Sequence, residues 1–125
     1  MLRAGAVKLF MDPAYPSPAV DRPCGPNCIE HVGETNYSMD EIEALAVAAA
    51  SADLDIVVHC GGNRAIDYAL GAFDAVRRSH GSKDLRLRIE HAFIAHASQA
   101  HRMAELGVSL VAQPGLGSAF GSLFR

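Results

Sequence analysis

The chain has 125 residues, half of them hydrophobic, and a formal net charge of -3 at pH 7. This composition is typical of a globular protein, and the scattered basic residues argue against a nucleic-acid-binding surface. No apolar run reaches the roughly 20 residues needed to cross a bilayer, and an odd number of cysteines does not suggest a disulfide scaffold. We therefore expect a cytoplasmic protein that binds neither nucleic acid nor membranes.

Helical and strand-like patterns alternate along the chain. A first helix is predicted to follow Ser38, which opens a capping box. A second is predicted to begin at Asn63 as N-cap and to end at Gly81, and a third to begin around His96 and to end at Gly107. Four short apolar segments predict strands: Ala6–Phe10, Leu54–His59, Leu85–His91 and Val108–Gln113.

This alternation predicts an α/β fold with a parallel sheet, since strand–helix–strand units connect parallel neighbours. A doubly wound sheet and a (β/α)8 barrel both satisfy it. The G-x-G-x-x-G phosphate-binding motif is absent. Lys8, His59, His91 and Gln113 lie at or near the carboxyl ends of the predicted strands, where barrel enzymes place their chemistry, and this favours the barrel.

Residues 13–37 form a proline-rich loop without periodicity, which predicts either a lid over the site or a flexible insertion. Within the loop, Cys24, Cys28 and His31 have nearly the spacing of zinc ligands, and a small zinc-binding module is one alternative function. A fourth ligand is not evident in the sequence, and structural zinc sites are almost always four-coordinate.

His59 and His91 end successive parallel strands. Neighbouring strands lie about 4.8 Å apart, so the two imidazoles can converge on one metal ion. The alternative is that each is a hydrogen-bonded structural histidine. Cys60 should point away from His59 as a buried core thiol. The charged side chains on the third strand, Arg86, Arg88 and Glu90, are expected on its outward face, paired with neighbouring helices.

Several segments, spaced one strand–helix unit apart, resemble the amidohydrolase superfamily and in particular its family 3 branch. They are VKLFMD at 7–12, VHCGGNRAID at 58–67, RIEHA at 88–92, MAELGV at 103–108 and QP at 113–114.

The resemblance implies part of a (β/α)8 barrel that hydrolyses amide-type, non-peptide C–N bonds of a small molecule. It implies one or two divalent metals, usually zinc. The four strands would be barrel strands four to seven, and His59 and His91 match the metal ligands of strands five and six. Lys8 falls where many relatives carry a carboxylated lysine that bridges two metals; the alternative is an ordinary cation.

Two expected elements are missing from the sequence. The family's first strand supplies a His-x-His pair and its last strand an Asp that acts as general base, and neither is present. A complete barrel needs about 250 residues. We therefore expect residues 1–125 to be a fragment of a barrel domain, inactive alone and able to self-associate through open sheet edges. The alternative is a non-catalytic barrel remnant or interaction module.

Overall fold

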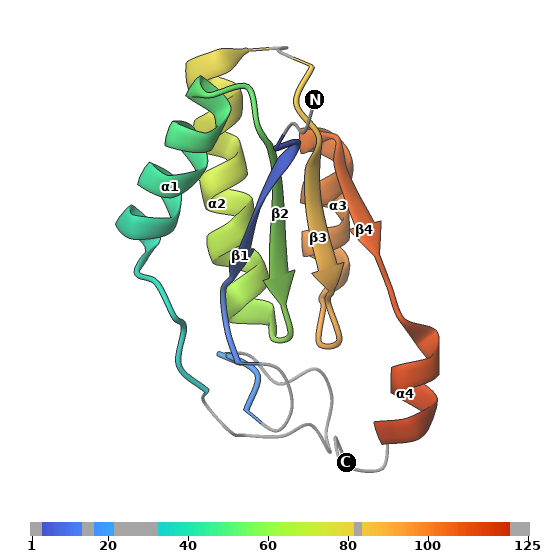
Figure 1. Ribbon diagram of the computed structural model, residues 1–125. Helices are drawn as coiled ribbons and strands as arrows, with labels where there is room; N and C mark the ends of the chain where they lie inside the picture. Colours follow the sequence, from blue (N-terminus) through green and yellow to red (C-terminus); the bar gives the residue numbers. More distant parts are fainter. Residues whose placement is uncertain (1–3, 14–16, 22–32, 82–83, 121–125) are drawn as a thin grey trace.

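The computed structural model describes residues 4–13, 17–21, 33–81 and 84–120 (Figure 1). Within these ranges, strands and helices alternate as the sequence pattern predicts. None of the described helices is long and apolar enough to cross a membrane.

The strands form one four-stranded sheet in the order β1-β2-β3-β4, with every neighbouring pair parallel. Phe10 lies beside His59 in the register, and Cys60 lies beside His91. The α/β class and the parallel sheet are therefore confirmed. The strand bounds are β1 (Ala6–Phe10), β2 (Asp55–Cys60), β3 (Leu87–His91) and β4 (Val108–Val111).

Local sequence signals explain most helix ends. The Ser38 hydroxyl accepts a hydrogen bond from the Glu41 N–H (3.3 Å), and the Glu41 carboxylate accepts from the Ser38 N–H (2.8 Å), which completes the capping box. Gly107 ends the third helix at φ 65°, a left-handed conformation that glycine adopts without strain. The helices are α1 (Met39–Ser51), α2 (Asn63–His80), α3 (Ala97–Leu106) and α4 (Pro114–Phe120).

Two helix predictions were wrong. The N-cap of α2 is Gly62 rather than Asn63, which is already the first helical residue. The presence of α4 was not predicted, because two glycines in a seven-residue segment argue against a helix. Pro114 at its first position is compatible with a helix start, since that N–H has no partner within a helix.

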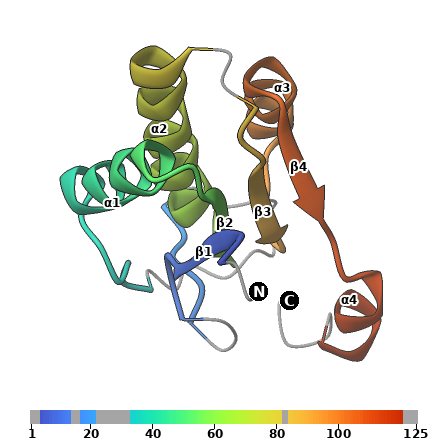
Figure 2. The same cartoon turned by 45° about the horizontal axis from the view of Figure 1, so that its top comes forward.

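The hydrophobic core lies between the sheet and helices α1, α2 and α3, which cover the same face (Figure 2). Ile56 and Val58 of β2 and Leu87 and Ile89 of β3 are fully buried there, and Phe73 of α2 packs within the same cluster. These residues alternate along each strand, as expected when one face of a sheet is packed.

The opposite face of the sheet carries the charged residues, which corrects one prediction. Arg86, Arg88 and Glu90 do not face the helices: Glu90 pairs with Lys8 of β1 and accepts a hydrogen bond from Arg88 (2.9 Å). The physical reason is that the alternate residues of β3, which are apolar, occupy the helix-covered side. A hollow of about 350 Å³ lies on this charged face, lined by Ala6, Asp55, Val57, Arg86, Arg88, Ser109 and Val111.

Candidate metal centre

Two histidine rings meet at the carboxyl edge of the sheet. His59 is 4% exposed near the end of β2, and its ring centroid lies 4.4 Å from that of His91 at the end of β3. The planes cross at 62°, and Phe10 and Phe93 flank the pair at centroid distances of 5.2 and 5.3 Å. The expected convergence of the two imidazoles is present.

An unusual backbone conformation brings His91 to this position. Strand alternation alone would place His91 on the helix-covered side, since it follows Ile89 by two residues and lies beside the buried Cys60. Instead, His91 and Ala92 have φ values of 77° and 48°, which non-glycine residues rarely adopt. The Ala92 N–H donates to the Cys60 carbonyl at 2.8 Å and fixes the turn. Such strain is concentrated at functional sites.

The ring chemistry fits a metal site. His59 Nε2 and His91 Nδ1 are buried and have no hydrogen-bond partner among the described residues, and the same holds for Gln113 Oε1. Buried polar atoms are normally paired, so these atoms call for a ligand or water. Burial, and secondly the neighbouring His91, lower the pKa of His59 below its usual 6.5. Neutral imidazole, the form this favours, is the form that binds zinc.

Asp12 was not singled out from the sequence, although it is central to the site. Its side chain is fully buried and accepts backbone hydrogen bonds from Ala19 (2.8 Å), Gly61 (2.8 Å) and Gly62 (2.9 Å). Its Oδ1 also lies 3.8 Å from His59 Nε2. The carboxylate thus joins the segments that leave β1 and β2. The available signal was its position two residues beyond a strand end.

The glycines after His59 are required by close packing. A Cβ at Gly62 would lie 2.0 Å from the Ala19 carbonyl oxygen, and one at Gly61 would lie 3.2 Å from Asp12 Oδ2. Pro18 and Ala19 of the proline-rich loop therefore pack directly on the segment that follows β2. Residues 14–16 and 22–32 of that loop lie outside the described residues, and with them Cys24, Cys28 and His31 of the alternative zinc-binding module.

Lys8 shares the charged face with His59 but has a protein partner. Its ammonium group forms an ion pair with the Glu90 carboxylate and lies 5.2 Å from the centroid of the Phe10 ring. The hydrogen bond from Lys8 is the main reason that the pKa of Glu90 is lowered. Lys8 therefore pairs with Glu90, and its role as a bridging ligand stays a prediction.

The two imidazoles form only part of a donor set. In the ranges that the structure describes, no group of three or more His, Cys, Asp or Glu side chains is placed to hold a metal ion. Cys60 does not contribute: it is fully buried in the core, as predicted, and burial raises its pKa.

A second polar network borders the site. The Asn63 amide lies 3.1 Å from His96 Nε2 and accepts the Asp21 N–H at 3.0 Å. Gln99 donates to the Asn63 carbonyl (2.7 Å) and to the Asp67 carboxylate (2.8 Å). Through these hydrogen bonds, His96 and Asp67 link α2 to the start of α3.

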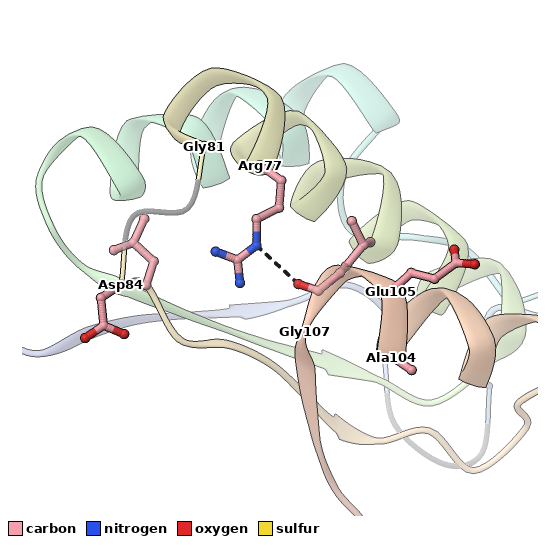
Figure 3. A pocket seen from close by; sticks show the side chains of 8 residues that line it. Arg77, Gly81, Asp84, Ala104, Glu105 and Gly107 are labelled. Atoms are coloured by element: carbon pink, nitrogen blue, oxygen red, sulfur yellow. Dashed lines mark hydrogen bonds between the residues drawn. The ribbon is translucent and has the colours of Figure 1, made fainter.

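A separate cavity of about 690 Å³ lies at the other end of the sheet, near the starts of β3 and β4 (Figure 3). Arg77 reaches across it from α2 and donates from Nε to the Leu106 carbonyl at 3.2 Å. Because this cavity lies away from the strand ends that carry His59 and His91, it plays no part in the candidate site.

Sequence comparison finds relatives that are much longer than this chain. Over 125 residues the chain is 48% identical to N-substituted formamide deformylase of Arthrobacter pascens, covering 23% of that protein. It is 27% identical over 120 residues to Protein LONG AFTER FAR-RED 3 of Arabidopsis thaliana, covering 20% of it. The chain therefore spans about a quarter or less of the length of these relatives.

Solved structures share the fold of this chain. An uncharacterized metal-dependent hydrolase from Pyrococcus furiosus matches 92% of this chain with a TM-score of 0.73 and 31% identity, over 23% of its own length. Another, from Pyrococcus horikoshii, matches 97% of this chain with a TM-score of 0.75 and 28% identity, over 24% of its length. The sequence profile of the Amidohydrolase family matches residues 1–122, so the chain belongs to the amidohydrolase family.

Proposed function

We propose that this chain supplies two metal ligands, His59 and His91, to a (β/α)8 hydrolase that cleaves amide-type C–N bonds. The observation that carries this is the pair of imidazoles at the carboxyl edge of the sheet, whose ring centroids lie 4.4 Å apart. On this assignment β1 to β4 are barrel strands four to seven. When bound, a divalent metal such as zinc supplies Lewis acidity for the carbonyl and lowers the pKa of a water toward about 7.

The other residues have supporting roles in this proposal. Lys8 either joins the metal shell after carboxylation or, as the cation paired with Glu90, helps to set the charge at the barrel mouth. A lid formed by residues 13–37, of which 14–16 and 22–32 lie outside the described residues, stays a prediction. The general base is not among these 125 residues, which contain no Asp beyond position 84, and we assign it to another part of a longer protein.

For the substrate class, we propose N-substituted formamides. The support is the 48% identity to a protein named N-substituted formamide deformylase, over all 125 residues of this chain. The reaction would add water across the formyl C–N bond and release formate and an amine. Identity at this level over the whole chain is compatible with a shared substrate pocket.

The test is a chimera in which this chain replaces the matching segment of the Arthrobacter pascens deformylase. We expect zinc-dependent release of formate from an N-alkylformamide, and its loss on either His59→Ala or His91→Ala. His101→Ala, which alters an exposed histidine on α3, is the matched control and should retain activity. A chimera that folds and binds zinc but releases no formate would contradict the proposal.

One observation favours a non-catalytic role instead. Within the described part of the chain, no set of three metal-binding side chains is assembled. A barrel remnant that acts as an interaction module does not need a complete metal site, so the missing third ligand would not impair its function. The chimera separates the two functions, because a remnant would fold in the deformylase scaffold without supporting hydrolysis.

We further propose that the edges of β1 and β4 are closed by additional strands. Neither edge pairs with another strand in the described chain, and Leu110 and Val111 of β4 are 48% and 38% exposed. Unpaired edges with exposed apolar residues promote association. The isolated chain should therefore elute as dimers or larger species in size-exclusion chromatography, and a sharply melting monomer would contradict this.

A further inference from the structure

We propose that Asp12 is the positioning residue for His59. The Asp12 carboxylate accepts a hydrogen bond from the Nε2–H group of the imidazole, and this leaves Nδ1 as the metal-binding atom. The inference rests on the proposed function, since it concerns how one of its ligands is oriented. Nothing in the chain's strand pattern assigns this role to Asp12, which lies outside the strands. Two observations support the role: the hydrogen bonds that the Asp12 carboxylate accepts, and the missing hydrogen-bond partner of His59 Nε2.

The Asp12 carboxylate is rigidly held. Its Oδ2 accepts the N–H groups of Ala19 and Gly62, and its Oδ1 accepts that of Gly61. Oδ1 therefore has one hydrogen bond and capacity for another, whereas Oδ2 already has two. The oxygen with spare capacity is the one that lies 3.8 Å from His59 Nε2.

His59 has the complementary need. Its Nε2 is buried without a hydrogen-bond partner among the described residues, and Oδ1 of Asp12 lies near this nitrogen. The separation is roughly 1 Å longer than a normal hydrogen bond, so a small rotation of the ring closes it. A histidine that ligates a metal almost always donates its other ring N–H to a carboxylate, carbonyl or water, which fixes the tautomer.

The same contacts explain why Asp12 is buried with its charge. One carboxylate orients the backbone of Gly61 and Gly62, two and three residues after His59, and also the His59 ring. Asp12→Asn would change both functions in a predictable way. To keep the two bonds at Oδ2, the amide oxygen must occupy that position, so its NH2 group faces His59 Nε2. The ring would then present Nε2 as an acceptor and carry its proton on Nδ1.

The test uses the 125-residue chain and two measurements. Nitrogen-15 NMR of the metal-free wild-type chain should show His59 as the Nε2–H tautomer, and Asp12→Asn should convert it to Nδ1–H. Zinc titration should show Asp12→Asn binding about 10- to 100-fold more weakly than wild type. Asp55→Asn is the matched control, because Asp55 also accepts a backbone N–H (Arg86, 3.0 Å) but at the other end of β2. It should leave both tautomer and zinc affinity unchanged.

The outcomes are decisive in each case. A wild-type Nδ1–H tautomer, or equal zinc affinities for Asp12→Asn and Asp55→Asn, would overturn the inference. If Asp12→Asn does not fold, the wild-type tautomer alone decides. His91→Ala distinguishes this inference from the proposed function. If His91→Ala leaves the zinc affinity unchanged, the proposed metal site is wrong. If zinc binding needs His91 but His59 is the Nδ1–H tautomer, only the role of Asp12 is refuted.

Discussion

The two faces of the sheet have opposite characters. On the face under α1, α2 and α3, residues such as Ile56 and Ile89 have no exposed surface. On the other face, Lys8, Arg88 and Glu90 form partly exposed ion pairs, and Arg88 also lines a hollow. Since both faces belong to the same strands, alternate residues serve different purposes. The helix-covered face provides stability, and the open face, with the strand ends above it, provides the polar groups available for chemistry.

The largest effect should come from the helix-covered face. Ile89→Ala should lower the free energy of unfolding by about 2–5 kcal/mol, because it removes buried methyl groups and leaves a cavity. Leu110→Ala is the matched control: Leu110 lies beside Ile89 in the register but is 48% exposed, so about 1 kcal/mol is expected. Urea unfolding measures both, and equal losses would show that the two positions do not differ in packing.

A smaller effect should come from the start of α1, which attaches the helical layer. Ser38→Ala removes the cap of the Glu41 N–H and should cost about 0.5–2 kcal/mol. The Ser38 N–H lowers the pKa of Glu41 from its usual 4.5. The capping box therefore stabilises the fold above pH 4.5, and this contribution is lost as the pH falls through the lowered pKa. Ser38→Ala keeps the backbone N–H that binds the Glu41 carboxylate but loses the hydroxyl cap of the Glu41 N–H, which does not depend on pH. In thermal melts from pH 7 to 3, the difference between wild type and Ser38→Ala should therefore narrow, as the bond from the Ser38 hydroxyl to the carboxylate weakens, but not vanish.

The smallest effect should come from the open face. Lys8→Met breaks the ion pair with Glu90, whose partners are 33% and 20% exposed, and should change stability by at most about 1 kcal/mol. A double-mutant cycle with Glu90→Gln isolates the coupling between the two side chains. A coupling of several kcal/mol would mean that the open face also carries stability, and the contrast between the faces would fail.

Alternation and capping made the fold predictable. The strand pattern gave the parallel sheet, Ser38 gave the start of α1, and Gly81 and Gly107 gave two helix ends. Strand alternation could not decide which face of β3 is covered, because charged residues at every second position suit either side of a sheet until the helices are placed. Arg86, Arg88 and Glu90 were assigned to the wrong face for this reason.

The site was only partly predictable. His59 and His91 could be singled out because they end neighbouring strands, but the left-handed turn at His91 and Ala92 that brings the rings together has no signal in the residues. The role of Asp12 depends on three backbone N–H groups, one of them from a loop residue, Ala19, and two from the segment after β2. Contacts of this kind follow from tertiary packing and are not encoded in a local motif.

The central claim is that His59 and His91 hold a divalent metal together. Zinc titration of the purified 125-residue chain against a chromophoric chelator tests it most directly. We predict that wild type binds zinc, that His59→Ala and His91→Ala each weaken binding at least about 10-fold, and that His101→Ala does not. Equal zinc affinity in all four proteins, with each shown to be folded by circular dichroism, would contradict the claim.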